Sequence, residues 1–164
     1  MSTANNDHRY RPNVGLCVFN AQGLVFLGKR IGLTREDSWQ MPQGGMDQGE
    51  TPLEAALREL EEEIGVPAAL VDVLEESADW LFYDFPPEIR DAMHKRGNYL
   101  GQKQKWFALR FKGEDRDIRL DAHEAEFSEW RWAELAYAPS AVVAFKRAVY
   151  EDVAQRFARY AAGN

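Results

Sequence analysis

The sequence predicts an α/β protein in which helices cover the faces of a mixed β-sheet. Short apolar runs with strand-like patterning alternate irregularly with helical segments, as expected for this fold class. The length of 164 residues fits one domain, and no repeat or linker divides the chain. We expect residues 1–12 to be loosely ordered and residues 13–160 to form a single domain.

The first predicted element is a β-hairpin. Two strand-like runs, Val14–Phe19 and Leu24–Arg30, are joined by Asn20–Gly23, which has the residues of a hairpin turn. The following stretch, Ile31–Gly49, contains four glycines and Pro42. This composition predicts a loop without regular structure.

A helix is predicted directly after this loop. Thr51 can cap it, Pro52 suits its first turn, and Glu54 completes a T-x-x-E capping box. Gly65 and then Pro67 are typical of a helix end. We therefore expect the helix to begin near Pro52 and to end before Gly65.

One side of this helix is apolar. Leucine and isoleucine side chains recur at helical spacing and form a narrow stripe, which we expect to pack on the sheet: Leu53, Leu57, Leu60 and Ile64. Ala55 and Ala56 lie one turn before the acidic group described next. Their small size is expected to leave room for a substrate.

The neighbouring side of the helix is acidic. Glu59, Glu62 and Glu63 stand at positions i, i+3 and i+4, so three carboxylates meet within one turn and repel one another. Hard divalent cations such as Mg²⁺ or Mn²⁺ take oxygen ligands and bridge to phosphates, which fits this group. Glu54 and Glu61 project to another side and are expected to face water.

The second half of the chain continues the mixed pattern. Val71–Tyr83 and Lys105–Phe111 are predicted strands, Phe127–Trp132 is a shorter one, and Ser140–Tyr160 is a predicted C-terminal helix.

Charge and composition exclude several kinds of protein. A balance of 20 Lys and Arg against 27 Asp and Glu gives a net charge of −7. This charge disfavours binding along an extended nucleic acid but permits binding of one end of it. No apolar run is long enough to cross a membrane, and the first ten residues lack the apolar stretch of a secretory signal. We therefore expect a cytoplasmic protein. The single cysteine, Cys17, is expected to be buried.

Residues 44–66 read GGMDQGETPLEAALRELEEEIGV and fill every fixed position of the Nudix box, G-x5-E-x7-R-E-U-x-E-E-x-G-U, where U is aliphatic. The chain also resembles the bacterial RNA pyrophosphohydrolases and the similar diadenosine polyphosphate hydrolases in six further segments: Tyr10–Gly15, Ser38–Gly45, Gly101–Phe107, Glu124–Phe127, Trp130–Trp132 and Phe145–Arg147. One departure is Gly32–Asp37, which is longer than the same loop in those families.

The resemblance implies an α/β/α sandwich in which the box forms a loop and a helix beside a mixed sheet. It also implies that two or more Mg²⁺ or Mn²⁺ ions are held by the main-chain oxygen of Gly44 and by four carboxylates, those of Glu59, Glu62, Glu63 and Glu126. Arg58 and Glu50 are then orienting partners. Glu63 and Glu126, followed by Glu62, are our candidates for the general base that activates water.

Substrate contacts are also implied by the resemblance. The candidates are Arg11, Arg30, Ser38, Gln43, Tyr83, Lys103, Lys105, Phe145 and Lys146. On a strand, Lys103 and Lys105 would face away from Gln102 and Gln104, so only one of these pairs can face the substrate. Tyr83 and Phe145 are candidates to stack on a base.

The predicted function is metal-dependent removal of pyrophosphate from the 5′-triphosphate end of RNA. The alternative is hydrolysis of dinucleoside polyphosphates such as diadenosine tetraphosphate. A third hypothesis is a catalytically silent Nudix module that binds nucleotides, which we would expect to have lost carboxylates of the box. The bond that is cut, the oligomeric state and any protein partner stay open.

Overall fold

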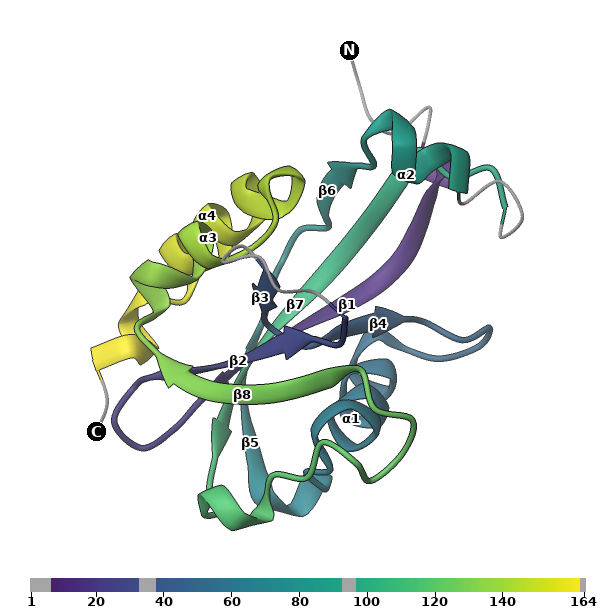
Figure 1. The fold of residues 1–164 in the computed structure, drawn as a ribbon. Helices are drawn as coiled ribbons and strands as arrows, with labels where there is room; N and C mark the ends of the chain where they lie inside the picture. Colours follow the sequence, from purple (N-terminus) through teal and green to yellow (C-terminus); the bar gives the residue numbers. More distant parts are fainter. Residues whose placement is uncertain (1–6, 33–37, 93–96, 163–164) are drawn as a thin grey trace.

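The computed structural model describes residues 7–32, 38–92 and 97–162. Within these residues, eight strands form one mixed sheet that lies between two helical layers (Figure 1). Helix α1, Pro52–Ile64, covers one face, and α3, Ala138–Ala141, and α4, Arg147–Arg156, cover the other. The predicted α/β/α architecture is confirmed. None of the described helices is long and apolar enough to cross a membrane.

The sheet is built around two long parallel strands, β1, Tyr10–Phe19, and β7, Gly101–Phe111. The other strands pair antiparallel to these or to each other and are β2 (Val25–Arg30), β3 (Trp39–Gln40), β4 (Gln43–Gly45), β5 (Val71–Glu76), β6 (Leu81–Asp84) and β8 (Phe127–Ala133).

The two central strands each begin four residues before their predicted starts. Tyr10 pairs with Gly101 and Val14 pairs with Lys105, so residues 10–12 belong to the sheet and our prediction that they are loosely ordered was wrong. The extra residues are mostly polar and lack a strand-like pattern. Pairing between two distant segments, rather than local sequence, makes them strands.

The β1–β2 hairpin is confirmed. The Asn20 side chain accepts hydrogen bonds from the main-chain N–H groups of Gln22 and Leu24, at 3.0 Å each. Gly23 has a φ of 81°, a left-handed conformation that favours glycine. The turn residues therefore set the register in which Phe19 faces Val25.

The predicted loop Ile31–Gly49 contains two short strands that the sequence did not reveal. β3 pairs with β2, and β4 pairs with β1. Their lengths of two and three residues give no usable periodicity, so only their partners define them. Of the unusual loop Gly32–Asp37, residues 33–37 lie outside the described residues.

The predicted strand Val71–Tyr83 is two strands with a break at Ser77. The Ser77 hydroxyl accepts a hydrogen bond from the Trp106 main-chain N–H at 3.0 Å and donates one to the Asp79 carbonyl at 2.9 Å. These bonds turn the chain between β5 and β6, which then pair with different parts of β7.

The C-terminal region is also more broken than predicted, and a short helix, α2, Pro87–Ala92, was not anticipated. Instead of one helix over Ser140–Tyr160, α3 ends at Ala141, and Val142 and Val143 adopt extended or near-extended backbone conformations. The chain then continues into a 3₁₀ turn, α4 and a final 3₁₀ segment, Ala158–Ala162.

The bounds of α1 are confirmed, including both hydrogen bonds of the capping box between Thr51 and Glu54. Its faces differ from our expectation. Leu53 is 38% exposed, whereas Ala55 and Ala56 are completely buried against the sheet, so they leave no room for a substrate. Small side chains allow the helix to lie close to β1.

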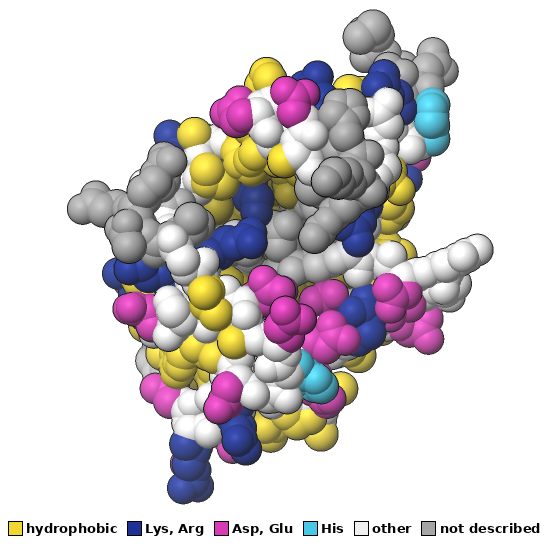
Figure 2. Space-filling model, turned by 45° about the vertical axis from the view of Figure 1, so that its right-hand side comes forward, with side chains coloured by type: hydrophobic (Ala, Val, Ile, Leu, Met, Phe, Trp, Pro, Cys, Tyr) yellow, Lys and Arg dark blue, Asp and Glu magenta, His cyan; other side chains and the backbone are white. Residues whose placement is uncertain are grey.

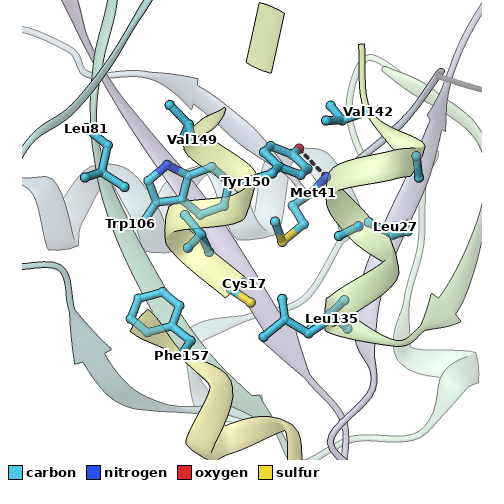
Figure 3. Packing of buried hydrophobic residues seen from close by; sticks show 14 of the residues in the cluster. Cys17, Leu27, Met41, Leu81, Trp106, Leu135, Val142, Val149, Tyr150 and Phe157 are labelled. Carbon is cyan, nitrogen blue, oxygen red and sulfur yellow. Dashed lines mark hydrogen bonds between the residues drawn. The ribbon is translucent and has the colours of Figure 1, made fainter. Parts of the chain in front are cut away.

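The two faces of the sheet carry separate cores. Residues under α1, such as Leu16 and Phe107, form one. Under α3 and α4, Cys17 and Trp106 pack with Tyr150, whose hydroxyl accepts a 2.8 Å hydrogen bond from the Met41 main-chain N–H (Figure 3). The predicted burial of Cys17 is confirmed, and burial raises the pKa of its thiol.

Candidate active site

A cleft of about 600 Å³ opens where the acidic side of α1 meets β1, β4, the start of β7 and the segment before β8. Its two walls differ in charge. Figure 2 shows the hollow with Lys and Arg side chains beside it and Asp and Glu side chains along its lower rim. The lining residues include five carboxylates: Glu59, Glu62, Glu63, Glu124 and Glu126.

The carboxylates of α1 are not equally exposed. Glu59 and Glu63 are each 9% exposed, whereas the Glu62 side chain is 44% exposed. Burial, followed by the nearby charges of Glu59 and Glu126, raises the pKa of Glu63 to about 8. Burial also raises the pKa of Glu59, against the opposing effect of Arg58. Glu59 and Glu63 are therefore harder to ionise than exposed glutamates when no cation lies beside them.

Gly44 lies directly beneath the Glu59 carboxylate. A side-chain carbon added at Gly44 would overlap that carboxylate. The backbone of the β4 loop therefore lies close to the acidic face of α1, and a larger residue at position 44 would displace the Glu59 carboxylate.

Arg58 ties this loop to the helix. Its guanidinium donates to both Glu50 oxygens, from Nε at 2.7 Å and from Nη2 at 2.9 Å, and to the Gly45 carbonyl at 2.9 Å. It also donates to Glu59 Oε1 at 2.9 Å and to Glu62 Oε2 at 3.1 Å. Hydrogen bonding with Arg58 lowers the pKa of Glu50 to about 2.

Glu126 reaches the cleft from a distant part of the chain. It lies just before β8 and is exposed. Its carbonyl accepts a hydrogen bond from the Ile31 main-chain N–H at 3.0 Å, which fixes this segment to the end of β2. The negative charge of Glu126 acts on Glu63, so the two carboxylates belong to one electrostatic group.

The donor set of this wall fits a divalent cation. Glu63 Oε2 is buried and has no hydrogen-bond partner, an arrangement that is costly unless a ligand completes it. Within the described ranges, no three His, Cys, Asp or Glu side chains form a ready coordination shell. Arg58 holds one oxygen each of Glu59 and Glu62, so a cation would compete with Arg58 for these carboxylates.

The opposite wall carries positively charged and amide side chains. Arg11 and Arg30 line it together with the amides of Asn13, Gln40, Gln43 and Gln102. Gln43 Nε2 donates to Gln102 Oε1 at 3.2 Å, and the Tyr83 hydroxyl donates to the same oxygen in a short hydrogen bond. The structure thus brings three of the predicted substrate residues to the cleft, Arg11, Arg30 and Gln43.

A smaller apolar pocket of about 170 Å³ adjoins the cleft and shares Arg30 and Gln40 with it. The predicted substrate residues Ser38, Phe145 and Lys146 line this pocket. Lys146 is 5% exposed, and its Nζ donates to Gln43 Oε1 at 3.1 Å. Burial, with the positive charge of Arg30, lowers the pKa of Lys146 to about 7.

Three predicted substrate contacts are placed elsewhere. Tyr83 is 7% exposed and packs against Phe145, with ring centroids 5.7 Å apart, so the two rings contact each other. Lys103 and Lys105 line neither pocket. They lie on the other face of β7 beside Trp80, because Gln102 faces the cleft.

These two lysines have partners of their own. Lys103 forms a 2.7 Å ion pair with Asp7, and Lys105 donates to the carbonyls of Ser77 and Ala78.

Residues 9–153 match the NUDIX domain family. The chain belongs to the Nudix family. Similar proteins include the RNA pyrophosphohydrolase of Novosphingobium aromaticivorans, which is 54% identical over 90% of this chain and 92% of that protein. The RNA pyrophosphohydrolase of Agrobacterium fabrum is 47% identical over 96% of each chain.

Solved structures show the same Nudix fold. The Ap4A hydrolase binary complex of C. elegans superposes with a TM-score of 0.64 at 19% identity, covering 91% of this chain and 98% of that one. The dihydroneopterin triphosphate pyrophosphohydrolase of E. coli gives a TM-score of 0.65 at 19% identity, covering 90% and 98%. At this identity the likeness concerns the fold alone.

Sequence reasoning missed several residues of the Nudix cleft. Gln102 faces it, although the alternation of glutamine and lysine in β7 left either pair possible. Asn13, His123 and Glu124 also line the cleft. Asn13 sits two residues after Arg11 on the same strand, and this spacing was the available sign that both face the same way.

Proposed function

We propose that this Nudix protein is an RNA pyrophosphohydrolase that removes pyrophosphate from 5′-triphosphate ends with the help of divalent cations. The observation that carries the proposal is the pairing of unlike walls in one cleft: buried carboxylates that need a cation face arginine and amide donors that suit phosphate. The name shared by relatives 47–54% identical to the chain supports RNA as the substrate.

The acidic wall would hold the cations. Glu59, Glu62, Glu63 and Glu126, with the main-chain oxygen of Gly44, are the proposed ligands, and Mg²⁺ or Mn²⁺ in two or more copies suits this oxygen-only set. When bound, such cations neutralise phosphate charge and lower the pKa of water. Arg58 would keep the Glu59 and Glu62 carboxylates and the Gly45 loop in place.

Glu63 is the proposed general base, with Glu126 as the second candidate. Its Oε2 is buried and has no hydrogen-bond partner, whereas Glu59 and Glu62 each accept a hydrogen bond from Arg58. A general base must be free to accept a proton from water. Glu126 is exposed and reachable by water, but it belongs to a loop rather than to the rigid helix.

Arg11 and the neighbouring amides would bind the phosphate chain from the other wall. Charge-assisted hydrogen bonds from a guanidinium are among the strong contacts that phosphate makes in proteins. The apolar pocket beside the cleft, with Phe145 at its edge, would take an uncharged part of the RNA. We also propose that the protein acts in the cytoplasm.

The alternative substrate is a dinucleoside polyphosphate, which presents the same phosphate chain with a nucleoside at each end. A steady-state comparison of a 5′-triphosphorylated RNA oligonucleotide with diadenosine tetraphosphate, each with Mg²⁺ and with Mn²⁺, tests the proposal. We expect a higher kcat/KM for the RNA. A hundredfold preference for diadenosine tetraphosphate would overturn the assignment in favour of the alternative.

A further inference from the structure

A row of buried hydrogen bonds runs from the core to the cleft. Trp106 Nε1 donates to Gln104 Oε1 at 2.9 Å, and Gln104 Nε2 donates to Asn13 Oδ1 at 2.8 Å. The three residues are 0%, 1% and 2% exposed, and Asn13 lines the cleft. The row therefore connects a core indole to the wall that faces the carboxylates.

The indole dictates the direction of every bond in the row, because its N–H can donate but not accept. Gln104 must turn its Oε1 toward Trp106 and its Nε2 toward Asn13. Asn13 must then accept with Oδ1, which leaves Nδ2 and its hydrogen atoms for the cleft. Reversing either amide would leave a buried donor without an acceptor.

Trp106 is held so that this direction cannot change. Its ring lies over Gly15, where any added side-chain carbon would overlap it. The Tyr150 ring packs edge-on against the Trp106 ring, with ring centroids 5.6 Å apart. The indole N–H therefore points toward Gln104 in a fixed position.

We propose that Trp106 and Gln104 are positioning residues that make Asn13 a phosphate-binding donor. This inference rests on the proposed function, because it assigns Asn13 to the substrate's phosphate chain. Ionised phosphate oxygens accept hydrogen bonds and cannot donate them. An amide that was free to turn would present its oxygen to the anion part of the time, whereas a fixed donor needs no reorganisation when the anion binds.

The position of Asn13 agrees with this role. Arg11 and Asn13 are two residues apart on β1, so their side chains project on the same side of the sheet. Both line the cleft, opposite the carboxylates of α1. The proposed contact thus adds one uncharged donor to the wall that carries Arg11 and Arg30, and an amide tolerates burial better than a further guanidinium would.

Two variants test the row. Gln104→Met keeps a similar volume without either polar atom, and Trp106→Phe removes the indole N–H. Cys17→Ala is the matched control, because it removes atoms from the same core cluster without touching a hydrogen bond of the row. The thermal midpoint of each variant, with kcat and KM for a 5′-triphosphorylated RNA oligonucleotide in Mg²⁺, would be measured.

We expect Gln104→Met to raise KM about 5- to 10-fold and Trp106→Phe to raise it about 3-fold, with kcat within about twofold, because a contact shared by ground and transition states is weakened. Cys17→Ala should lower the thermal midpoint without raising KM. If folded Gln104→Met and Trp106→Phe variants show the KM of Cys17→Ala, the row has no positioning role.

A second measurement does not depend on turnover. The side-chain NH₂ resonances of Asn13 can be identified by their loss in Asn13→Asp and followed by NMR during titration with inorganic pyrophosphate and Mg²⁺. We expect them to shift in the wild type and to shift less in Gln104→Met. No shift in the wild type would overturn the inference even if the protein hydrolyses RNA. A shift without RNA hydrolysis would instead count only against the proposed substrate.

Discussion

Arg58 and Glu50 form a two-pronged ion pair, with Arg58 Nε 2.7 Å from Glu50 Oε2 and Arg58 Nη2 2.9 Å from Glu50 Oε1. The pair joins the loop after β4 to the middle of α1. Because the same guanidinium also contacts Glu59 and Glu62, the position of the loop and the orientation of the carboxylates depend on one side chain.

Replacing Arg58 with lysine should therefore impair catalysis more than stability. A lysine keeps the charge but cannot form the planar fork, so Arg58→Lys should lower kcat/KM about 10- to 100-fold. Arg116→Lys is the control, since Arg116 pairs with Glu114 on the surface with 83% of its side chain exposed. Equal kinetics for the two variants would contradict the organising role of Arg58.

Glu63→Gln should lower kcat about 10²- to 10⁴-fold, because an amide can neither take a proton from water nor neutralise a cation. Glu61→Gln is the matched control on the same helix, since the Glu61 side chain is 57% exposed. Single-turnover assays with triphosphorylated RNA would separate chemistry from product release. Unchanged turnover in Glu63→Gln would revive the hypothesis of a catalytically silent Nudix module.

The stability of the metal-free protein should fall as pH rises. The pKa of Glu63 is about 8 in the folded protein against 4.5 ordinarily, so the folded state binds more protons than the unfolded state between these values. The contribution of Glu63 to the free energy of unfolding has its full value below about pH 4.5 and is lost as the pH rises to about 8.

Chemical unfolding in the presence of a chelator, between about pH 5 and about pH 7, would measure this slope, which is at most about 1.4 kcal/mol per pH unit for one proton. The pKa of Lys146 is lowered to about 7 from 10.5, so its own contribution increases stability only above this window. Glu63→Gln should flatten the slope. An equal slope in the variant would show that Glu63 is not the group responsible.

Magnesium should stabilise the protein more at about pH 8 than at about pH 5, because protons and cations compete for the same carboxylates. Thermal unfolding with and without Mg²⁺ at both pH values would show this, and a chelator should abolish turnover. Glu63→Gln should reduce the shift at the higher pH. A shift that is independent of pH would argue against binding at these buried glutamates.

Alanine substitutions of Arg11 and Lys103 should have very different effects on KM, although both residues are basic and lie near the ends of paired strands. Arg11 lines the cleft, so Arg11→Ala should raise KM for triphosphorylated RNA about 10- to 100-fold. Lys103 is paired with Asp7 and Trp80 on the opposite face, so Lys103→Ala should change KM less than about twofold. Steady-state assays at constant ionic strength would decide whether Lys103 contributes.

The sequence alone determined helix α1, because its signals are local. The capping box of Thr51 and Glu54, the helix end at Gly65 and the spacing of Glu59, Glu62 and Glu63 all act within four residues along the chain. The β1–β2 hairpin was predictable for the same reason, since Asn20 and Gly23 form the turn by themselves.

The tertiary structure decided what depends on distant partners. Strands β3 and β4 exist because β2 and β1 pair with them, and Ala55 and Ala56 are buried because α1 lies close to the sheet. In the sequence, glutamines and lysines alternate along β7, and nothing local shows which of them face the cleft. Only the pairing of β7 with β1 and β6 places Gln102 in the cleft and Lys103 behind it, because the side-chain direction of a strand is fixed by the sheet around it.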